Sequence, residues 1–180
     1  MITLASCFMA IGILHLLLAS PMLVNPTGAL KVVKAFPRHD WAGRILAAMC
    51  IVWSVYLVRE MPLGWFDAYK GWLYVAGPIL YLLISIFMAD LLAARALGGL
   101  LLLVASPVLE AAAFQPSALR LILVVLAYVW VIAGMALVLA PYRFRKTAQM
   151  LCGTTGQCRV VGGAGVVFGA GLVGLGWLAF

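Results

Sequence analysis

Residues 121–142 read LILVVLAYVWVIAGMALVLAPY, and the basic residues Arg143, Arg145 and Lys146 follow at once. This run of 22 residues contains no charged side chain. An α-helix needs about 20 apolar residues to cross the hydrocarbon core of a bilayer, and a basic flank is typical of the cytoplasmic membrane surface. The stretch therefore predicts a transmembrane helix that ends at that surface.

The rest of the chain has the same character. Of the 180 residues, 67% are hydrophobic and 9% are charged, whereas soluble domains are about 45–50% apolar and about 25% charged. Further charge-free runs occur at 1–30, 45–58, 71–89, 96–109 and 160–180. The sequence thus predicts an all-α, polytopic membrane protein with six transmembrane helices in a single domain over 1–180. Little of the chain remains for a soluble catalytic domain.

Three of the runs need adjustment before they fit one span each. The run 1–30 is too long, and the prolines, asparagine and glycine between positions 21 and 28 predict a break near residue 24. The run 45–58 reaches a usable length if it starts at Trp41 and Arg44 extends to the interface. The run 96–109 is the weakest span, because it contains Ser106 and Pro107.

The distribution of lysine and arginine predicts the orientation, because short loops rich in these residues stay in the cytoplasm. If all six runs cross, one side carries nine of the 12 basic residues against two acidic ones, and the other side carries three of each. The nine are Lys31, Lys34, Arg38, Arg44, Arg95, Arg143, Arg145, Lys146 and Arg159. A re-entrant fourth run would split these loops between opposite faces. Six crossings therefore fit better, with both termini outside the cytoplasm and the first span as an uncleaved signal anchor.

A short pattern recurs near the start of each even-numbered span. The copies are Arg44-Ile-Leu-Ala-Ala48, Arg95-Ala-Leu-Gly-Gly99 and Arg159-Val-Val-Gly-Gly163. Each arginine is a candidate interfacial anchor, and each small pair lets a neighbouring backbone approach closely. We interpret the repeat as three parallel helical hairpins, at about 1–60, 70–115 and 119–180, with basic amphipathic linkers in the first and third. For the middle copy, chance occurrence of so simple a pattern is an equal alternative.

The last hairpin carries a family resemblance. Pro141-Tyr-Arg-Phe-Arg145, a basic linker, Arg159-Val-Val-Gly-Gly163 and a glycine-rich helix together resemble the YjeT-like family of small bacterial inner-membrane hairpins. Residues 21–58 are similar more loosely, and the middle hairpin lacks the long linker. The resemblance implies residence in a bacterial inner membrane and a structural unit, and it transfers no catalytic residue.

Candidate ligands for a metal or cofactor are few. His15 lies in the first span and His39 in a linker, so the two histidines are at different depths and cannot form an axial haem pair. His15 alone is a candidate pigment or haem ligand, and the alternative is a hydrogen bond to a neighbouring helix. Cys152 and Cys158 are expected to be free thiols, because zinc sites use about four ligands and the cytoplasm is reducing. The sequence predicts no metal, no cofactor and, lacking a catalytic motif, no enzyme.

Two acidic residues suggest a different function. Asp90 and Glu110 lie near opposite ends of spans three and four, and ionisable groups inside a membrane often mark ion or proton pathways. Pro78 and Pro107 can kink the same two spans. A small carrier or channel using Asp90 and Glu110 as a relay is therefore an alternative function, set against ordinary placement of both acids at the interface.

The last span is rich in glycine, with seven between Gly162 and Gly176. Gly162, Gly165 and Gly169 are candidate helix-packing residues, because helix association in lipid relies on close van der Waals contact. Their face could contact this bundle or another subunit. The sequence thus predicts an accessory or scaffold subunit of a larger bacterial inner-membrane complex. Its expected partners are the lipid bilayer and other integral membrane subunits, and no nucleic acid is expected.

Overall fold

The computed structural model describes residues 3–88, 91–113 and 115–178, and all regular structure within these ranges is helical. The elements are α1 (Leu4–Val24), α2 (Pro26–Ala35), η1 (Phe36–Arg38), α3 (Asp40–Glu60), η2 (Gly64–Trp72), α4 (Leu73–Phe87), α5 (Leu92–Ala113), α6 (Arg120–Leu139), α7 (Tyr142–Leu151) and α8 (Thr155–Leu178). Six helical segments are long and apolar enough to cross a membrane: α1, α3, η2 with α4, α5, α6 and α8. The prediction of an all-helical chain with six such segments is confirmed.

The predicted break after the first span is confirmed. Helix α1 ends at Val24, and the side-chain oxygen of Asn25 accepts a hydrogen bond of 3.0 Å from the backbone N–H of Gly28. Pro26 opens α2, where its missing N–H costs nothing. Pro21, in contrast, lies inside α1. The capping signals at 25–28 therefore turn the chain, and Pro21 does not.

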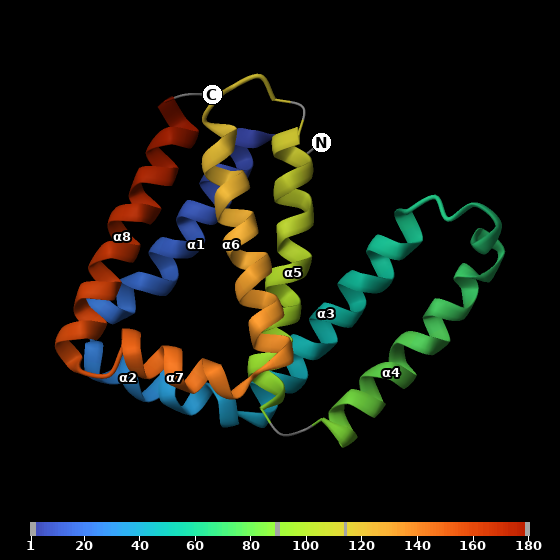
Figure 1. Cartoon of the computed structure of the whole chain (residues 1–180), viewed down its shortest axis with the longest axis horizontal. Helices are drawn as coiled ribbons and strands as arrows, with labels where there is room; N and C mark the ends of the chain where they lie inside the picture. The colour runs from blue at the N-terminus through green and yellow to red at the C-terminus, as the bar shows by residue number, and fades with distance from the viewer. Residues whose placement is uncertain (1–2, 89–90, 114, 179–180) are drawn as a thin grey trace.

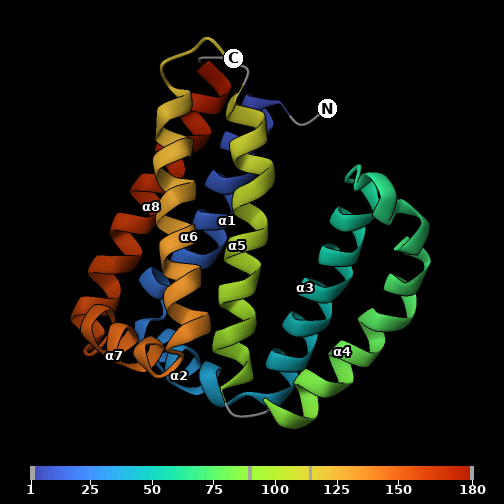
Figure 2. The ribbon, with the colours of Figure 1, turned by 45° about the vertical axis from the view of Figure 1, so that its right-hand side comes forward.

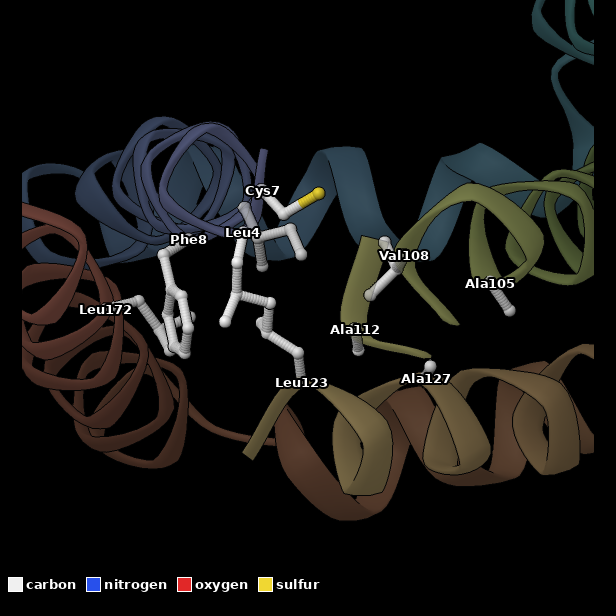
Figure 3. Close-up of a cluster of buried hydrophobic side chains, with 10 residues drawn as sticks. Leu4, Cys7, Phe8, Ala105, Val108, Ala112, Leu123, Ala127 and Leu172 are labelled. Atoms are coloured by element: carbon white, nitrogen blue, oxygen red, sulfur yellow. The ribbon is translucent and has the colours of Figure 1, made fainter. Parts of the chain in front are cut away.

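Four helices enclose the main hydrophobic core. Helices α1, α5, α6 and α8 meet near the end of the bundle that holds both chain termini (Figure 1). Leu4 and Phe8 of α1 are fully buried there against Leu123 of α6 and Leu172 of α8, beside small residues of α5 (Figure 3). Alanine and valine on α5 let this helix approach the others closely.

The most extensive helix contacts join α1 to α8 and α5 to α6, and α3 contacts both α5 and α4. The three-hairpin arrangement is not confirmed, because the two long helices of each predicted hairpin share few or no contacts among the described residues. The physical reason is that the repeated arginine with its two small residues marks only where a helix starts. Which helices lie side by side depends instead on which surfaces of small residues contact each other.

Helices α3 and α4 form an arm beside the four-helix core (Figure 2). The first turns of α3 contact the first turns of α5, where Ala47, Leu92 and Ala96 are buried together. At the far end of the arm, the Lys70 ammonium donates to the carbonyl oxygens of Arg59 and Met61 at 2.9 and 2.6 Å. It also forms an ion pair of 2.7 Å with Asp67. These contacts close the connection between α3 and α4.

Helices α2 and α7 lie across the other end of the bundle, away from the termini (Figures 1 and 2). They contact each other, and the rings of Phe36 in η1 and Phe144 in α7 have centroids 5.7 Å apart. They are the two linkers that the sequence predicts to be basic and amphipathic. Helices α3, α5 and α8 all begin at this same end.

Candidate functional site

The crossing of α1 and α8 depends on a pair of glycines. A Cβ atom added at Gly169 would lie 2.9 Å from the carbonyl oxygen of Gly12, and one added at Gly12 would lie 2.8 Å from that of Gly169. Real Cβ atoms essentially never approach an oxygen so closely, so the backbones touch where neither residue has a side chain. This is the close approach that small residues permit between helices in lipid.

The other predicted helix-packing residues share this face of α8. A Cβ atom at Gly162 would lie 2.8 Å from the Cβ of Met22, and one at Gly165 would lie 2.8 Å from the Cβ of Ala19. Gly162, Gly165 and Gly169 therefore all face α1. The sequence left open whether this face contacts the protein's own bundle or another subunit. In the structure it contacts α1 of the same chain.

Helix α8 carries a second small surface that contacts no other helix among the described residues. Added Cβ atoms at Gly163, Gly171 and Gly174 would meet no heavy atom within 4 Å. At about 100° per residue, these three glycines lie on the side of α8 opposite to the α1 contact. Val167, 74% exposed, lies between them on this side. We call Gly163, Val167, Gly171 and Gly174 the outer face of α8.

Two further glycine contacts occur, and sequence reasoning identified Gly98 as part of a small pair but missed its partner Gly134 and also Gly43. Helices α5 and α6 cross at Gly98 and Gly134. A Cβ atom added at Gly98 would lie 2.8 Å from the carbonyl oxygen of Gly134, and one added at Gly134 would lie 2.7 Å from that of Gly98. A Cβ at Gly43 would lie 2.9 Å from the backbone nitrogen of Ala93, where α3 meets α5. Gly134 is the only glycine in the span 121–142, and this was the available signal.

The three predicted interfacial anchors lie near the starts of their helices. Arg44, Arg95 and Arg159 belong to the first two turns of α3, α5 and α8, at the end of the bundle that carries α2 and α7. Arg44 and Arg159 are exposed, whereas Arg95 is half-buried and its Nε has no hydrogen-bond partner among the described residues.

The small pairs of the repeat behave alike in all three copies. The first member of each pair is buried, namely Ala47, Gly98 and Gly162, and the second is only half-buried. The three copies of the pattern are thus alike in the burial of this one position, and the repeat itself stays a prediction. Each helix turns the first small residue toward a neighbour directly after its basic end.

His15 lies where α1, α6 and α8 approach one another. Its Nδ1 is 2.9 Å from the carbonyl oxygen of Ile11, and because a carbonyl can only accept, Nδ1 carries the proton. The imidazole stacks on Trp130 with ring centroids 6.5 Å apart, and it makes an edge-on contact with Phe168 with ring centroids 5.4 Å apart. The hydrogen bond is thus made within α1 instead of to a neighbouring helix. No group of three or more histidine, cysteine or acidic residues suited to a metal occurs among the described residues.

The two acids of the predicted relay are not brought together by the described structure. Asp90 lies outside the described residues. Glu110 is exposed in the last turn of α5 and has no ion pair within the described part of the chain. The relay therefore stays a prediction from sequence.

Cys152 and Cys158 come together beneath α2. Both are free and buried, in a small cluster with Leu30. Burial, a hydrogen bond to Cys158 and repulsion from that thiol all raise the pKa of Cys152. A raised pKa keeps the thiol protonated and therefore a poor nucleophile and metal ligand at neutral pH.

No protein-family model, no curated protein and no solved structure matches this chain. The geometry of its surfaces is therefore the basis on which a function is assigned.

Proposed function

We propose that the chain is an integral membrane protein of the bacterial inner membrane that has α2 and α7 on the cytoplasmic surface. Six helical segments of spanning length support this placement. Nine of the 12 basic residues belong to α2, η1, α7 and the first turns of α3, α5 and α8, which share one end of the bundle, and the start of α1 and the end of α8 lie at the other. Basic loops are retained in the cytoplasm, so the termini are placed on the opposite side. The resemblance of the last hairpin to YjeT-like proteins, which stays a prediction, agrees with a bacterial source.

Within that membrane, we propose that the protein is an accessory or scaffold subunit that binds the helices of other integral subunits. The observation that carries this proposal is the outer face of α8. Gly163, Gly171 and Gly174 repeat on this side the small-residue surface that already joins α8 to α1 on the other. Lipid chains gain nothing from such a surface, whereas a second helix gains close van der Waals contact.

Photo-crosslinking in native membranes tests this role. A photoreactive phenylalanine analogue is placed at Gly171 on the outer face, and as a control at Ile132, which is 65% exposed on α6 among bulky side chains. We expect the probe at Gly171 to yield one discrete protein adduct and the probe at Ile132 to yield mainly lipid adducts. A second variant, Gly171→Leu, is expected to abolish migration of the chain in a larger native complex, whereas Ala10→Leu, an exposed small-to-large change on α1, leaves the complex intact.

The proposal fails if the chain is a stable monomer in mild detergent and the probe at Gly171 recovers no protein partner. It also fails if Gly171→Leu leaves a native complex unchanged, because the outer face would then have no role in assembly. The buried glycines are unsuitable for this test, since changing them would disturb the fold.

A further inference from the structure

A small pocket opens between α2 and α7, on the end of the bundle that carries the basic linkers. Its volume is about 140 Å³, and it is lined by Val33, Lys34, Pro37, Arg145, Ala148 and Gln149. A single water needs about 10–15 Å³ by such a measure, so the space is large enough for a group of several heavy atoms. The ring contact between Phe36 and Phe144 joins η1, which directly follows α2, to α7.

Within the described residues, neither cation that lines this pocket forms an ion pair. Lys34 enters it from α2 and Arg145 from α7, and the stretches 26–38 and 141–151 contain no aspartate or glutamate. Within the described residues, the only ion pair is between Lys70 and Asp67, which lies in the connection between α3 and α4. Two cations from different helices therefore line one pocket with no ion-pair partner among the described residues. Both side chains are exposed, so water and salt screen them in the free protein, and an anion bound between them would interact with both charges.

The side chains suit one class of anion. Arginine presents a planar fork of donors that matches two oxygens of a phosphate, and lysine supplies a compact charge beside it. The amide of Gln149 adds a neutral donor, and Val33 and Pro37 provide an apolar wall. At a membrane surface, this combination fits an anionic group whose remainder is apolar or extends into the lipid.

We propose that the pocket between α2 and α7 is a binding site for one phosphate group, held by Lys34 and Arg145 with Gln149 beside them. The phosphate comes either from the headgroup of an anionic phospholipid or from a free phosphate. This site is separate from the outer face of α8 and does not depend on the scaffold role.

Native mass spectrometry of the purified full chain in neutral detergent tests the proposal. Phosphatidylglycerol is titrated to give the affinity of the first bound molecule, oleate serves as an anionic lipid without phosphate, and inorganic phosphate is added as competitor. The pocket variant is Lys34→Gln with Arg145→Gln. The matched control, Lys31→Gln with Arg143→Gln, removes equal charge from exposed positions of the same two helices that do not line the pocket.

We expect one phosphatidylglycerol to bind first, and the pocket variant to weaken that step roughly tenfold or more, as the loss of charge-assisted hydrogen bonds implies. The control variant should weaken it by less than about threefold. Ala148→Phe, which fills the pocket and keeps both cations, should have the effect of the pocket variant and so separates the pocket from the charge alone. Competition by inorganic phosphate would assign the site to free phosphate, and its failure would assign it to the lipid headgroup.

Equal weakening by the pocket and control variants would overturn the proposal, because it would show diffuse attraction of anionic lipid to a basic surface. Binding of oleate at the same site with the same affinity would overturn the choice of phosphate. Unchanged binding in Ala148→Phe would show that the pocket is not the site.

Discussion

At Gly169 the absence of a side chain sets the distance between two helices, whereas two residues later, at Gly171, a side chain would point into open space. Both glycines lie in the glycine-rich stretch 162–176, but only Gly169 contacts another helix. The same contrast separates Gly162 from Gly163. A glycine count alone therefore predicts a close contact somewhere on α8, and only the three-dimensional structure shows which glycines make it.

Alanine substitutions at these two positions should have opposite effects. In Gly169→Ala the new Cβ meets the Gly12 carbonyl oxygen at 2.9 Å, so the helices must separate, and we expect a loss of about 1–3 kcal/mol typical of overpacking. In Gly171→Ala the new methyl meets nothing and the higher helix propensity of alanine stabilises by up to about 1 kcal/mol. Unfolding in detergent, followed by circular dichroism, measures both. Equal destabilisation by the two changes would contradict the assigned faces.

The thiol of Cys152 provides a pH-dependent test. Burial and the neighbouring Cys158 raise its pKa above the ordinary value of 9.0, so the reactive thiolate is scarce at pH 8 and increases only as the pH rises past 9. Site-resolved alkylation with iodoacetamide should therefore be slow at pH 8 and still accelerating above pH 9. Cys158→Ala removes the hydrogen bond and the repulsion from Cys158 and leaves only burial to raise the pKa. The rate of Cys152 alkylation should then rise at lower pH. A rate that levels off below pH 8 would contradict the buried environment.

The same shift has a consequence for stability. The unfolded chain loses the Cys152 proton at lower pH than the folded chain does, because the folded pKa is the higher one. When the pH exceeds the pKa of Cys152 in the unfolded chain, the unfolded state binds fewer protons than the native state. A rise in pH then favours unfolding. The contribution of Cys152 to stability is complete below about pH 8 and decreases in alkaline solution.

At the scale of elements, the helix ends were the most predictable features and the helix pairs the least. Asn25 and Pro26 stop α1 and start α2 through capping chemistry that is visible in the sequence. The fourth span looked weak because it contains Pro107, yet α5 is one continuous helix from Leu92 to Ala113. A proline inside a helix removes one backbone hydrogen bond and crowds the preceding turn, but Ala105 and Val108 on either side of Pro107 are buried against α1, α6 and α8 and support the helix there.

The start of α2 depends on a single side chain. The oxygen of Asn25 accepts hydrogen bonds from the Gly28 N–H and from the Thr27 hydroxyl, at 3.0 and 2.9 Å. Asn25→Ala should destabilise this helix end by about 0.5–2 kcal/mol, whereas Asn25→Asp keeps the acceptor. Hydrogen exchange of the amides of α2 should increase in the first variant and stay near the original in the second. Equal protection in both variants would show that the cap contributes nothing.

At the scale of the whole molecule, the number of candidate spans and the gathering of basic residues at one end could be derived from the charge-free runs and the charge positions, but the neighbours of each helix could not. Residues near the two ends of the chain, in α1 and α8, form the most extensive contact. Each span is apolar on nearly every side, so hydrophobicity does not mark a contact face. Small residues do mark it, but Gly12 and Gly134 are each the only glycine of their span, and a single glycine gave too weak a signal. The open α3–α4 arm has no sequence signature at all.

The arrangement predicts a definite orientation. Helices α2 and α7 and the basic starts of α3, α5 and α8 share one end, and η2 lies with the termini at the other (Figure 1). A membrane-spanning chain with this distribution of charge has its basic end in the cytoplasm. Ala68 in η2 and Thr147 in α7 are both exposed and report on the two ends.

Labelling of single cysteines in intact bacteria tests this orientation most directly. In a chain whose four native cysteines are replaced by alanine, Ala68→Cys and Thr147→Cys are each exposed to a maleimide that crosses the outer but not the inner membrane. We predict that the cysteine at position 68 is labelled in intact cells, and that the one at position 147 is labelled only after the inner membrane is permeabilised. Labelling of position 147 in intact cells, or protection of position 68, would contradict a six-span protein with α2 and α7 on the cytoplasmic surface.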